Sequence, residues 1–152
     1  MKICVCCSLS FTDKVKEIAN KLRELGHEVF LPNGVIIDAI HKKDFDPVKA
    51  KRNNGYDAVR EHFAKIDESD AVLVCNFTKN GIENYIGANT FLEMGYAYYI
   101  NKPIYALNPL PDFKYINDEL LNFDVKVLNG DLSKLWKFFS PHQVVSGISY
   151  QP

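Results

Sequence analysis

The sequence lacks a charge imbalance. Its 152 residues include 18 Lys and Arg against 19 Asp and Glu, which gives a formal net charge of −1 with histidine neutral. Such a chain has no bulk attraction for nucleic acid or for an anionic membrane surface. It also lacks an apolar run long enough to cross a bilayer, and charge from Asp13 onward interrupts the apolar start. We therefore expect a cytoplasmic protein that binds a small molecule, with no nucleic-acid or membrane partner.

Cysteine is scarce, and metal-binding patterns are missing. The four cysteines (Cys4, Cys6, Cys7 and Cys75) lie in apolar, strand-like runs, as expected of buried thiols in a reducing cytosol. Cys4 and Cys7 have C-x-x-C spacing, but alternation along a strand directs them to opposite faces. No second Cys or His pair stands at a zinc-type spacing. The sequence therefore predicts no metal site and no other cofactor.

The familiar phosphate-binding loops are absent as well. The chain contains neither G-x-G-x-x-G nor G-x-x-x-x-G-K-[ST], which argues against a dinucleotide dehydrogenase and a P-loop NTPase. It also shows no internal repeat, linker or low-complexity segment. Its length fits one domain over residues 1–152, with the apolar residues 141–152 as a docking tail.

Short apolar runs alternate with amphipathic stretches along the chain. The pattern predicts strands at 2–7, 27–31, 71–75, 103–107 and 125–128. Helices are expected at 12–25, 88–100, 117–121 and 132–139. One more helix is expected before the third strand, with an apolar face marked by Tyr56, Val59, Phe63 and Ile66. Residues 35–54 are less regular and are interpreted as a long, partly helical excursion. Without hairpin signals, this alternation favours a parallel sheet covered on both faces. We predict an α/β flavodoxin- or Rossmann-like three-layer sandwich, with a five-stranded parallel sheet in the order 2-1-3-4-5.

The predicted strand order also locates a binding site. Ligands of such sheets bind outside the carboxyl ends of the strands, where the strand order reverses. The loops expected there are 7–12, which contains Ser8, and 76–89, and both are rich in small and polar residues. Each leads into a helix whose first amides favour an anion. These loops suit a nucleoside or nucleotide, whereas the basic residues between Lys42 and Arg52 are interpreted as a solvated face.

One carboxylate stands in an apolar setting. Glu93 lies in the run NYIGANTFLEMGYA (84–97), next to Leu92 and Met94. The Gly and Asn residues before it allow backbone to approach a ligand at a helix start. A partly desolvated carboxylate at a strand-to-helix crevice suits a nucleophile or an acid/base. The alternative interpretation is an exposed helix residue, or one paired with Lys102.

The run ends in Glu-Met-Gly-Tyr-Ala and is followed by a short strand that begins with Lys-Pro. In this it resembles the nucleoside 2-deoxyribosyltransferase-like superfamily, which includes nucleoside 5′-monophosphate N-glycosidases, most strongly over residues 70–107. The resemblance implies that Glu93 attacks the anomeric carbon, expels the base and leaves a glycosyl-enzyme ester. Water or a second base then resolves the ester, in keeping with carboxylate chemistry at sugar centres.

Two positions depart from the superfamily pattern. Eight residues before Asp70, where members often carry Asp, this chain has His62. A histidine there acts as a general acid or orients Glu93, unless it is a surface residue. Six residues before Glu93, where transferases tend to carry Asp and nucleotide hydrolases Ser, it has Gly87. The choice between transferase and hydrolase therefore stays open. The expected catalytic residues are Glu93 and His62, and the expected substrate contacts are Ser8, Gly87, Asn89 and Thr90.

Two other functions also remain open. One is a nucleotide-binding or sensing module without turnover, and the other is a hydrolase of another nucleotide glycosidic bond, such as that of NAD. In either case, the apolar tail and the tyrosine-rich face at 96–99 predict a homo-oligomer, most simply a dimer. The superfamily resemblance implies the same, because its members commonly complete their sites across an interface.

Overall fold

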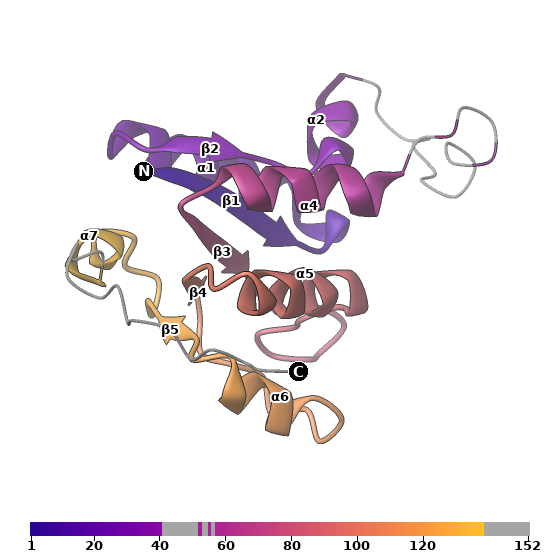
Figure 1. Ribbon diagram of the computed structural model, residues 1–152, viewed down its shortest axis with the longest axis vertical. Helices are drawn as coiled ribbons and strands as arrows, with labels where there is room; N and C mark the ends of the chain where they lie inside the picture. The colour runs from indigo at the N-terminus through magenta and orange to yellow at the C-terminus, as the bar shows by residue number, and fades with distance from the viewer. Residues whose placement is uncertain (41–51, 53–54, 56, 139–152) are drawn as a thin grey trace, which may run out of the picture.

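The computed structural model describes residues 1–40, 52, 55 and 57–138 (Figure 1). Its centre is a five-stranded parallel sheet. In spatial order the strands are β2 (Glu28–Phe30), β1 (Lys2–Cys7), β3 (Ala71–Cys75), β4 (Ile104–Ala106) and β5 (Lys126–Val127). This confirms the predicted α/β fold and the strand order 2-1-3-4-5. The later part of the irregular stretch 35–54 and the tail 141–152 fall outside the described residues.

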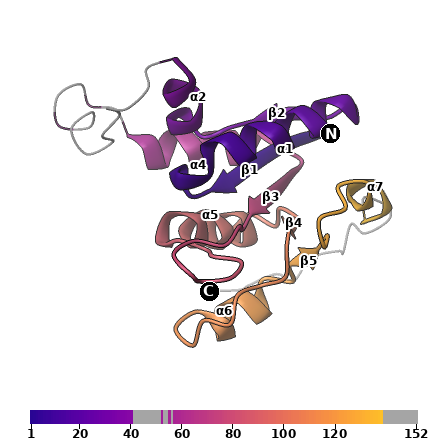
Figure 2. The same ribbon diagram turned by 180° about the vertical axis from the view of Figure 1, so that it is seen from behind.

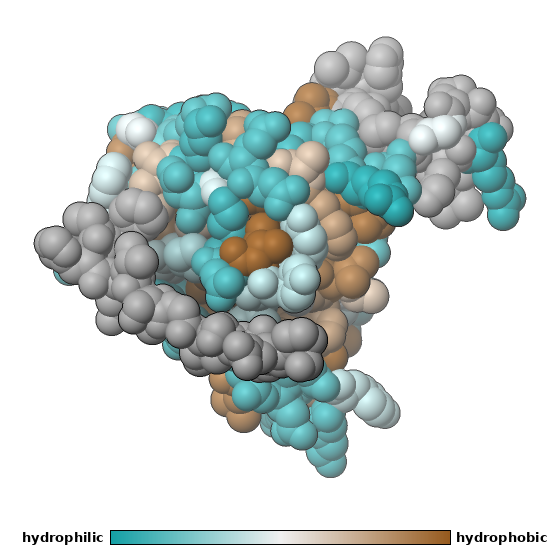
Figure 3. Space-filling view, in the orientation of Figure 1, coloured by the Kyte–Doolittle hydropathy of each residue, from teal (hydrophilic) through white to brown (hydrophobic). Residues whose placement is uncertain are grey.

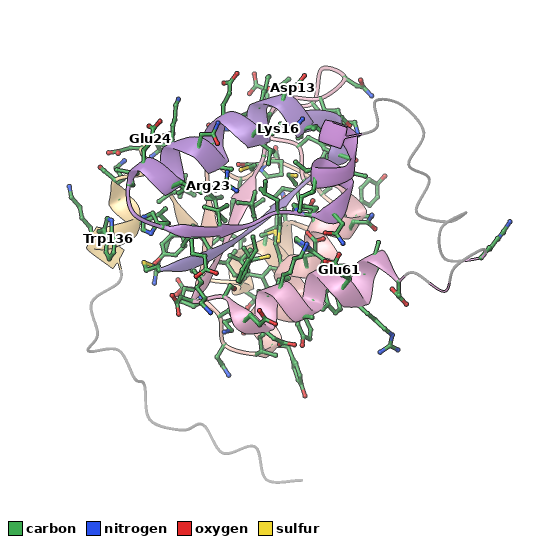
Figure 4. All side chains as sticks on the ribbon, turned by 90° about the horizontal axis from the view of Figure 1, so that it is seen from above. Asp13, Lys16, Arg23, Glu24, Glu61 and Trp136 are labelled. Atoms are coloured by element: carbon green, nitrogen blue, oxygen red, sulfur yellow. The ribbon has the colours of Figure 1, made fainter. Side chains whose placement is uncertain are left out.

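Helices lie on both faces of the sheet (Figures 1 and 2). One face is covered by α1 (Thr12–Glu24), α2 (Asn33–Ile40) and α7 (Lys134–Phe138). The other is covered by α4 (Ala58–Glu68), α5 (Ala88–Tyr99) and α6 (Asn117–Asn122). Figure 4 shows α1 and α4 on opposite sides of the strands. None of the helices in the described ranges is long and apolar enough to cross a membrane.

Strand β1 divides its side chains between the two halves of the core. Ile3, Val5 and Cys7 pack into the cluster beneath α1 and α7. Cys4 and Cys6 point the other way, into the cluster beneath α4 and α5. This division follows from the alternation of side chains along a strand, and β1 is held in place by its parallel pairing with β3. The expectation that Cys4 and Cys7 lie on opposite faces is confirmed, and two thiols are left side by side under α4 and α5.

The buried face of α4 differs from the predicted one. His62 and Ile66 are buried, one turn apart, whereas Val59 in the first turn is 42% exposed. Asp57 caps the helix, because its side chain accepts a hydrogen bond from the amide of Arg60 at 3.1 Å. The helix thus begins beyond Tyr56, which lies outside the described residues. The stripe against the sheet thus keeps Ile66 and the partly buried Phe63, as predicted, but takes in His62 in place of Val59.

Candidate functional site

Glu93 is largely, but not fully, buried on α5. Its side chain is only 14% exposed, while Thr90, Met94 and Ala97 of the same helix pack inward. Lys102 does not pair with it: the Lys102 ammonium donates to the carbonyl oxygens of Asp67 and Ser69. Both versions of the alternative interpretation, an exposed Glu or a Glu–Lys102 pair, are therefore excluded.

His62 lies beside this carboxylate. Its Nε2 atom is 3.7 Å from Oε1 of Glu93, and the His62 side chain is 3% exposed. The same nitrogen is 3.5 Å from Sγ of Cys6 and 3.7 Å from Sγ of Cys4. Helices α4 and α5 and strand β1 thus bring four polar or nucleophilic groups together beneath the helices. We call these residues, Cys4, Cys6, His62 and Glu93, the buried cluster.

Burial dominates the electrostatics of Glu93. Loss of solvent raises the pKa of the carboxyl group to about 7, against the opposing effects of the His62 charge and a hydrogen bond with Cys6. For His62, burial lowers the pKa, but its contact with Cys4 and the charge of Glu93 outweigh burial, so the pKa is raised. The hydrogen bond with Cys6 lowers the pKa of Cys4 to about 6, while burial raises that of Cys6 well above its usual value. The cluster therefore changes protonation near neutral pH, as acid/base sites do.

Two atoms of the buried cluster have no hydrogen-bond partner within the described part of the chain. They are Oε2 of Glu93 and Nδ1 of His62, both buried. Leaving a buried polar atom unpaired costs about 1–3 kcal/mol, so such atoms are rare in structural positions. Glu93 thus has one oxygen facing His62 and a second, buried oxygen with no partner among the described residues.

A cavity of about 790 Å³ lies along α5, and none of the four residues of the buried cluster lines it. This volume is within the usual size range of small-molecule sites. The stacked rings of Phe63 and Tyr96 form one wall, with centroids 4.2 Å apart. The other lining residues are Ile86, Gly87, Ala88, Asn89, Phe91, Leu92, Gly95, Phe113, Tyr115 and Ile116. Hydrophobic surface is visible on the side of the molecule where α4 and α5 lie (Figure 3). Glu93 does not line the cavity, but Asn89, one helical turn before it, does.

The four predicted substrate contacts are placed differently from one another. Gly87 and Asn89 line the cavity, and Gly87 is also the N-cap of α5. A Cβ atom at Gly87 would come within 3.2 Å of the ring of Tyr85, so a side chain there would require that ring to shift by a few tenths of an ångström. Thr90 is 3% exposed and belongs to the buried face of α5. The structure thus brings two of the four residues to the cavity wall and places a third in the core.

Ser8, the fourth, lies after β1 at the carboxyl end of the sheet. Its hydroxyl caps the short 3-10 turn η1 (Leu9–Phe11) by accepting from the amide of Ser10 at 3.5 Å. It also accepts a hydrogen bond of 3.1 Å from the ammonium of Lys79. The two loops predicted to form the binding edge therefore meet, and their meeting point carries a cation. Sequence reasoning missed Lys79, because it examined only the basic residues around 42–52.

Sequence reasoning also missed the two thiols of the buried cluster. It considered the Cys4–Cys7 spacing, whose members the strand separates, and not the Cys4-x-Cys6 spacing, whose members the strand places on one face. A signal was present, since alternate residues of a strand share a face. His62 could not be joined to them without the tertiary fold.

Together these observations define a doubly wound α/β protein with a buried Glu–His–thiol cluster near the carboxyl edge of its sheet. No known protein-family profile matches the chain, and no curated protein is similar to it. Among solved structures, it is similar to a 2-deoxyribosyltransferase from Bacillus psychrosaccharolyticus, with a TM-score of 0.49 and 20% identity over 74% of this chain and 76% of that one. It is also similar to FerB, a flavoenzyme NAD(P)H:acceptor oxidoreductase from Paracoccus denitrificans, with a TM-score of 0.44 and 17% identity over 83% and 74%. These neighbours are enzymes, and the likeness is one of fold.

Proposed function

We propose that this chain cleaves or transfers the N-glycosidic bond of a (deoxy)nucleoside or its 5′-monophosphate, with Glu93 as the nucleophile. One observation carries the proposal. The Glu93 carboxylate is buried under two helices, with one oxygen 3.7 Å from His62 and the other without a hydrogen-bond partner in the described ranges. The Glu-Met-Gly-Tyr-Ala run, which resembles that of the deoxyribosyltransferase-like superfamily, supports the same residue.

The reaction needs an ionised carboxylate close to the sugar. An oxygen of Glu93 forms a bond to the anomeric carbon while the bond from that carbon to the base nitrogen breaks. The electrons of the broken bond leave with the base, which takes up a proton. The negative charge of Glu93 stabilises the oxocarbenium-like transition state before the ester forms. Water then hydrolyses the ester, or a second base displaces the carboxylate, and Glu93 is regenerated.

His62 is a positioning residue in this scheme. Its ring contacts Glu93 and the two thiols, so it fixes where the carboxylate points. When protonated, it also offers Glu93 a counter-charge, which favours the ionised form needed for attack.

The surroundings of the cluster suit the remaining parts of a nucleotide. Phe63 and Tyr96 offer flat apolar surface to a base, and Asn89 offers amide donors and acceptors beside them. Lys79, held near Ser8, supplies a positive charge for a 5′-phosphate at the loop where such sheets bind anions. The structural likenesses described above carry no weight in this assignment.

The direct test is a chromatographic screen for free base. Purified protein is incubated with a panel of nucleosides and 5′-monophosphates, in ribo and deoxyribo forms, with and without an acceptor base. Wild-type protein should release base from at least one substrate, and a new nucleoside in the presence of acceptor would mark a transferase. Glu93→Gln should still bind that substrate without releasing base. Binding by both proteins with no release from any substrate would contradict the proposal and indicate a nucleotide-binding module.

A further inference from the structure

Three side chains of the buried cluster form a preorganised ligand set. The Sγ atoms of Cys4 and Cys6 and a ring nitrogen of His62 all lie within 4.8 Å of one another, and all three residues are buried. Two come from one face of β1, and the third projects from α4 towards them. Thiol sulfur and imidazole nitrogen are the donors that zinc prefers in proteins.

The spacing of these atoms can be compared with that of a real zinc site. Tetrahedral coordination with Zn–S bonds of about 2.3 Å and Zn–N bonds of about 2.0 Å places sulfur and nitrogen about 3.5 Å apart. The Nε2 atom of His62 is 3.5 Å from Sγ of Cys6 and 3.7 Å from Sγ of Cys4. Both separations are within about 0.2 Å of the tetrahedral value.

We propose that Cys4, Cys6 and His62 bind one Zn²⁺ ion, with Glu93 completing the coordination directly or through a water molecule. Oε1 of Glu93 lies 3.7 Å from Nε2 of His62, and Oε2 is buried with no partner among the described residues. Binding removes the thiol protons of both cysteines. Two thiolates and a neutral imidazole then balance the dication, so the three-ligand core carries no net charge into the interior. The expectation of no metal site rests on the C-x-x-C spacing of Cys4 and Cys7 and on the lack of a second Cys or His pair at zinc spacing. The proposed ligands are instead a C-x-C pair and one histidine far away in the sequence.

The ion would oppose the reaction proposed for this site. The Nε2 lone pair of His62 would bind the ion and could no longer contact Glu93. The Glu93 carboxylate would also be drawn towards the ion and away from an anomeric carbon. Zinc-loaded protein is therefore the inactive form and metal-free protein the active one. This consequence rests on the proposed function, whereas the binding of zinc does not.

Binding is tested on the full chain, purified with reductant and freed of metal by a chelator. Cobalt(II), which replaces zinc with visible spectra, is titrated first and then displaced by zinc. We expect one Co²⁺ per chain, with thiolate-to-cobalt charge-transfer absorption and the intense visible bands of tetrahedral cobalt. Cys4→Ala and Cys6→Ala should each weaken zinc binding by more than the roughly 100-fold that loss of an outer-shell partner can cost. Cys7→Ala and Cys75→Ala, on the opposite face of the sheet, are matched controls and should bind as wild type does.

X-ray absorption of the zinc-loaded wild type identifies the atoms bound to zinc without any substitution. It therefore tests the site even if a cysteine variant fails to fold. Two sulfur ligands at about 2.3 Å with nitrogen or oxygen ligands would support the site. Only oxygen or nitrogen ligands, no stoichiometric binding, or equal losses in the Cys75→Ala control would overturn it. The activity arm separates the two proposals. If the protein binds zinc but its metal-free form never releases base, the proposed function alone is refuted. Full activity with zinc bound would refute the inhibitory consequence alone.

Discussion

The imidazole of His62 on α4 lies 3.7 Å from the carboxylate of Glu93 on α5. The two helices pack side by side, and the rings of Phe63 and Tyr96 stack between them with planes only 4° apart. The pairing therefore depends on the spacing of two helices over one face of the sheet. In the superfamily that the sequence resembles, the position of His62 often carries Asp. This chain has a group there that can be a cation.

Glu93→Gln should abolish turnover while leaving the fold intact. Removal of a nucleophile closes the covalent route, so base release should fall by several orders of magnitude, not by the modest factor expected for a lost binding contact. Steady-state rates measured on the substrate found in the screen provide the check. Glu68→Gln, an exposed carboxylate on α4, is the matched control and should be near wild type. Retention of a tenth of wild-type activity by Glu93→Gln would refute the nucleophile.

Activity of the metal-free protein should rise with pH through neutrality. Burial raises the pKa of Glu93 to about 7, and only the ionised carboxylate attacks. Below that pH the carboxyl group is protonated and unreactive. The pH profile of kcat/KM should therefore show an ascending limb near 7, and an ascending limb near 4.5, the ordinary value for Glu, would show that the carboxylate is solvated.

The same shift predicts a stability effect. A carboxyl group whose pKa is higher in the folded than in the unfolded protein destabilises the fold as pH rises from the unfolded value of 4.5 to the folded value of about 7. Glu93→Gln cannot ionise, so its stability relative to wild type should improve by roughly 2 kcal/mol between pH 5 and pH 8. Urea unfolding of the metal-free proteins at both pH values measures it. An unchanged difference between the two proteins would mean that Glu93 is not buried as an acid.

Exchange of His62 should separate positioning from packing. His62→Asp introduces the residue common in the superfamily that the sequence resembles, whereas His62→Ala leaves a gap and removes the imidazole that lies 3.7 Å from Glu93. If His62 positions Glu93, Ala should lower kcat, by up to the roughly 10²–10⁴ that loss of a direct proton donor costs. Asp should retain more activity, and the ascending limb of its pH profile should shift. Near-normal and equal rates in both variants would remove His62 from the mechanism.

The chain should also assemble. Leu92, which lines the apolar cavity, is 50% exposed on α5, and Tyr99 of the same helix is 81% exposed. Closed pairing of two chains is the commonest way to cover such surface. Light scattering should report a multiple of 17.3 kDa. Tyr99→Ser and truncation after Ser140 should both shift the mass downward, and the truncation should also lower activity. Leu25→Ser, at the end of α1 on the other face, is the control. A monodisperse species of one chain with full activity after truncation would contradict a shared site.

The fold was predictable because its signals are local. Apolar strands alternating with amphipathic helices gave the sheet order, and Glu93 was identified by its apolar neighbours in the chain. His62 was found by its offset from Asp70, through the resemblance, and not from any local pattern. The thiols were missed because Cys4 and Cys6 meet His62 only when α4 packs over β1. Val59 was misplaced because apolar periodicity alone does not reveal that a histidine occupies the buried stripe.

Because side chains of β1 alternate between the two faces of the sheet, only its even-numbered positions can contribute to the buried cluster. Positions 4 and 6 face α4 and α5, while 3, 5 and 7 face α1. A single residue inserted between Cys4 and Cys6 would place the two thiols on opposite faces of the sheet, because successive side chains of a strand alternate. Only one thiol would then lie beside His62. Length changes between these two cysteines can therefore keep the pair on one face only in steps of two residues.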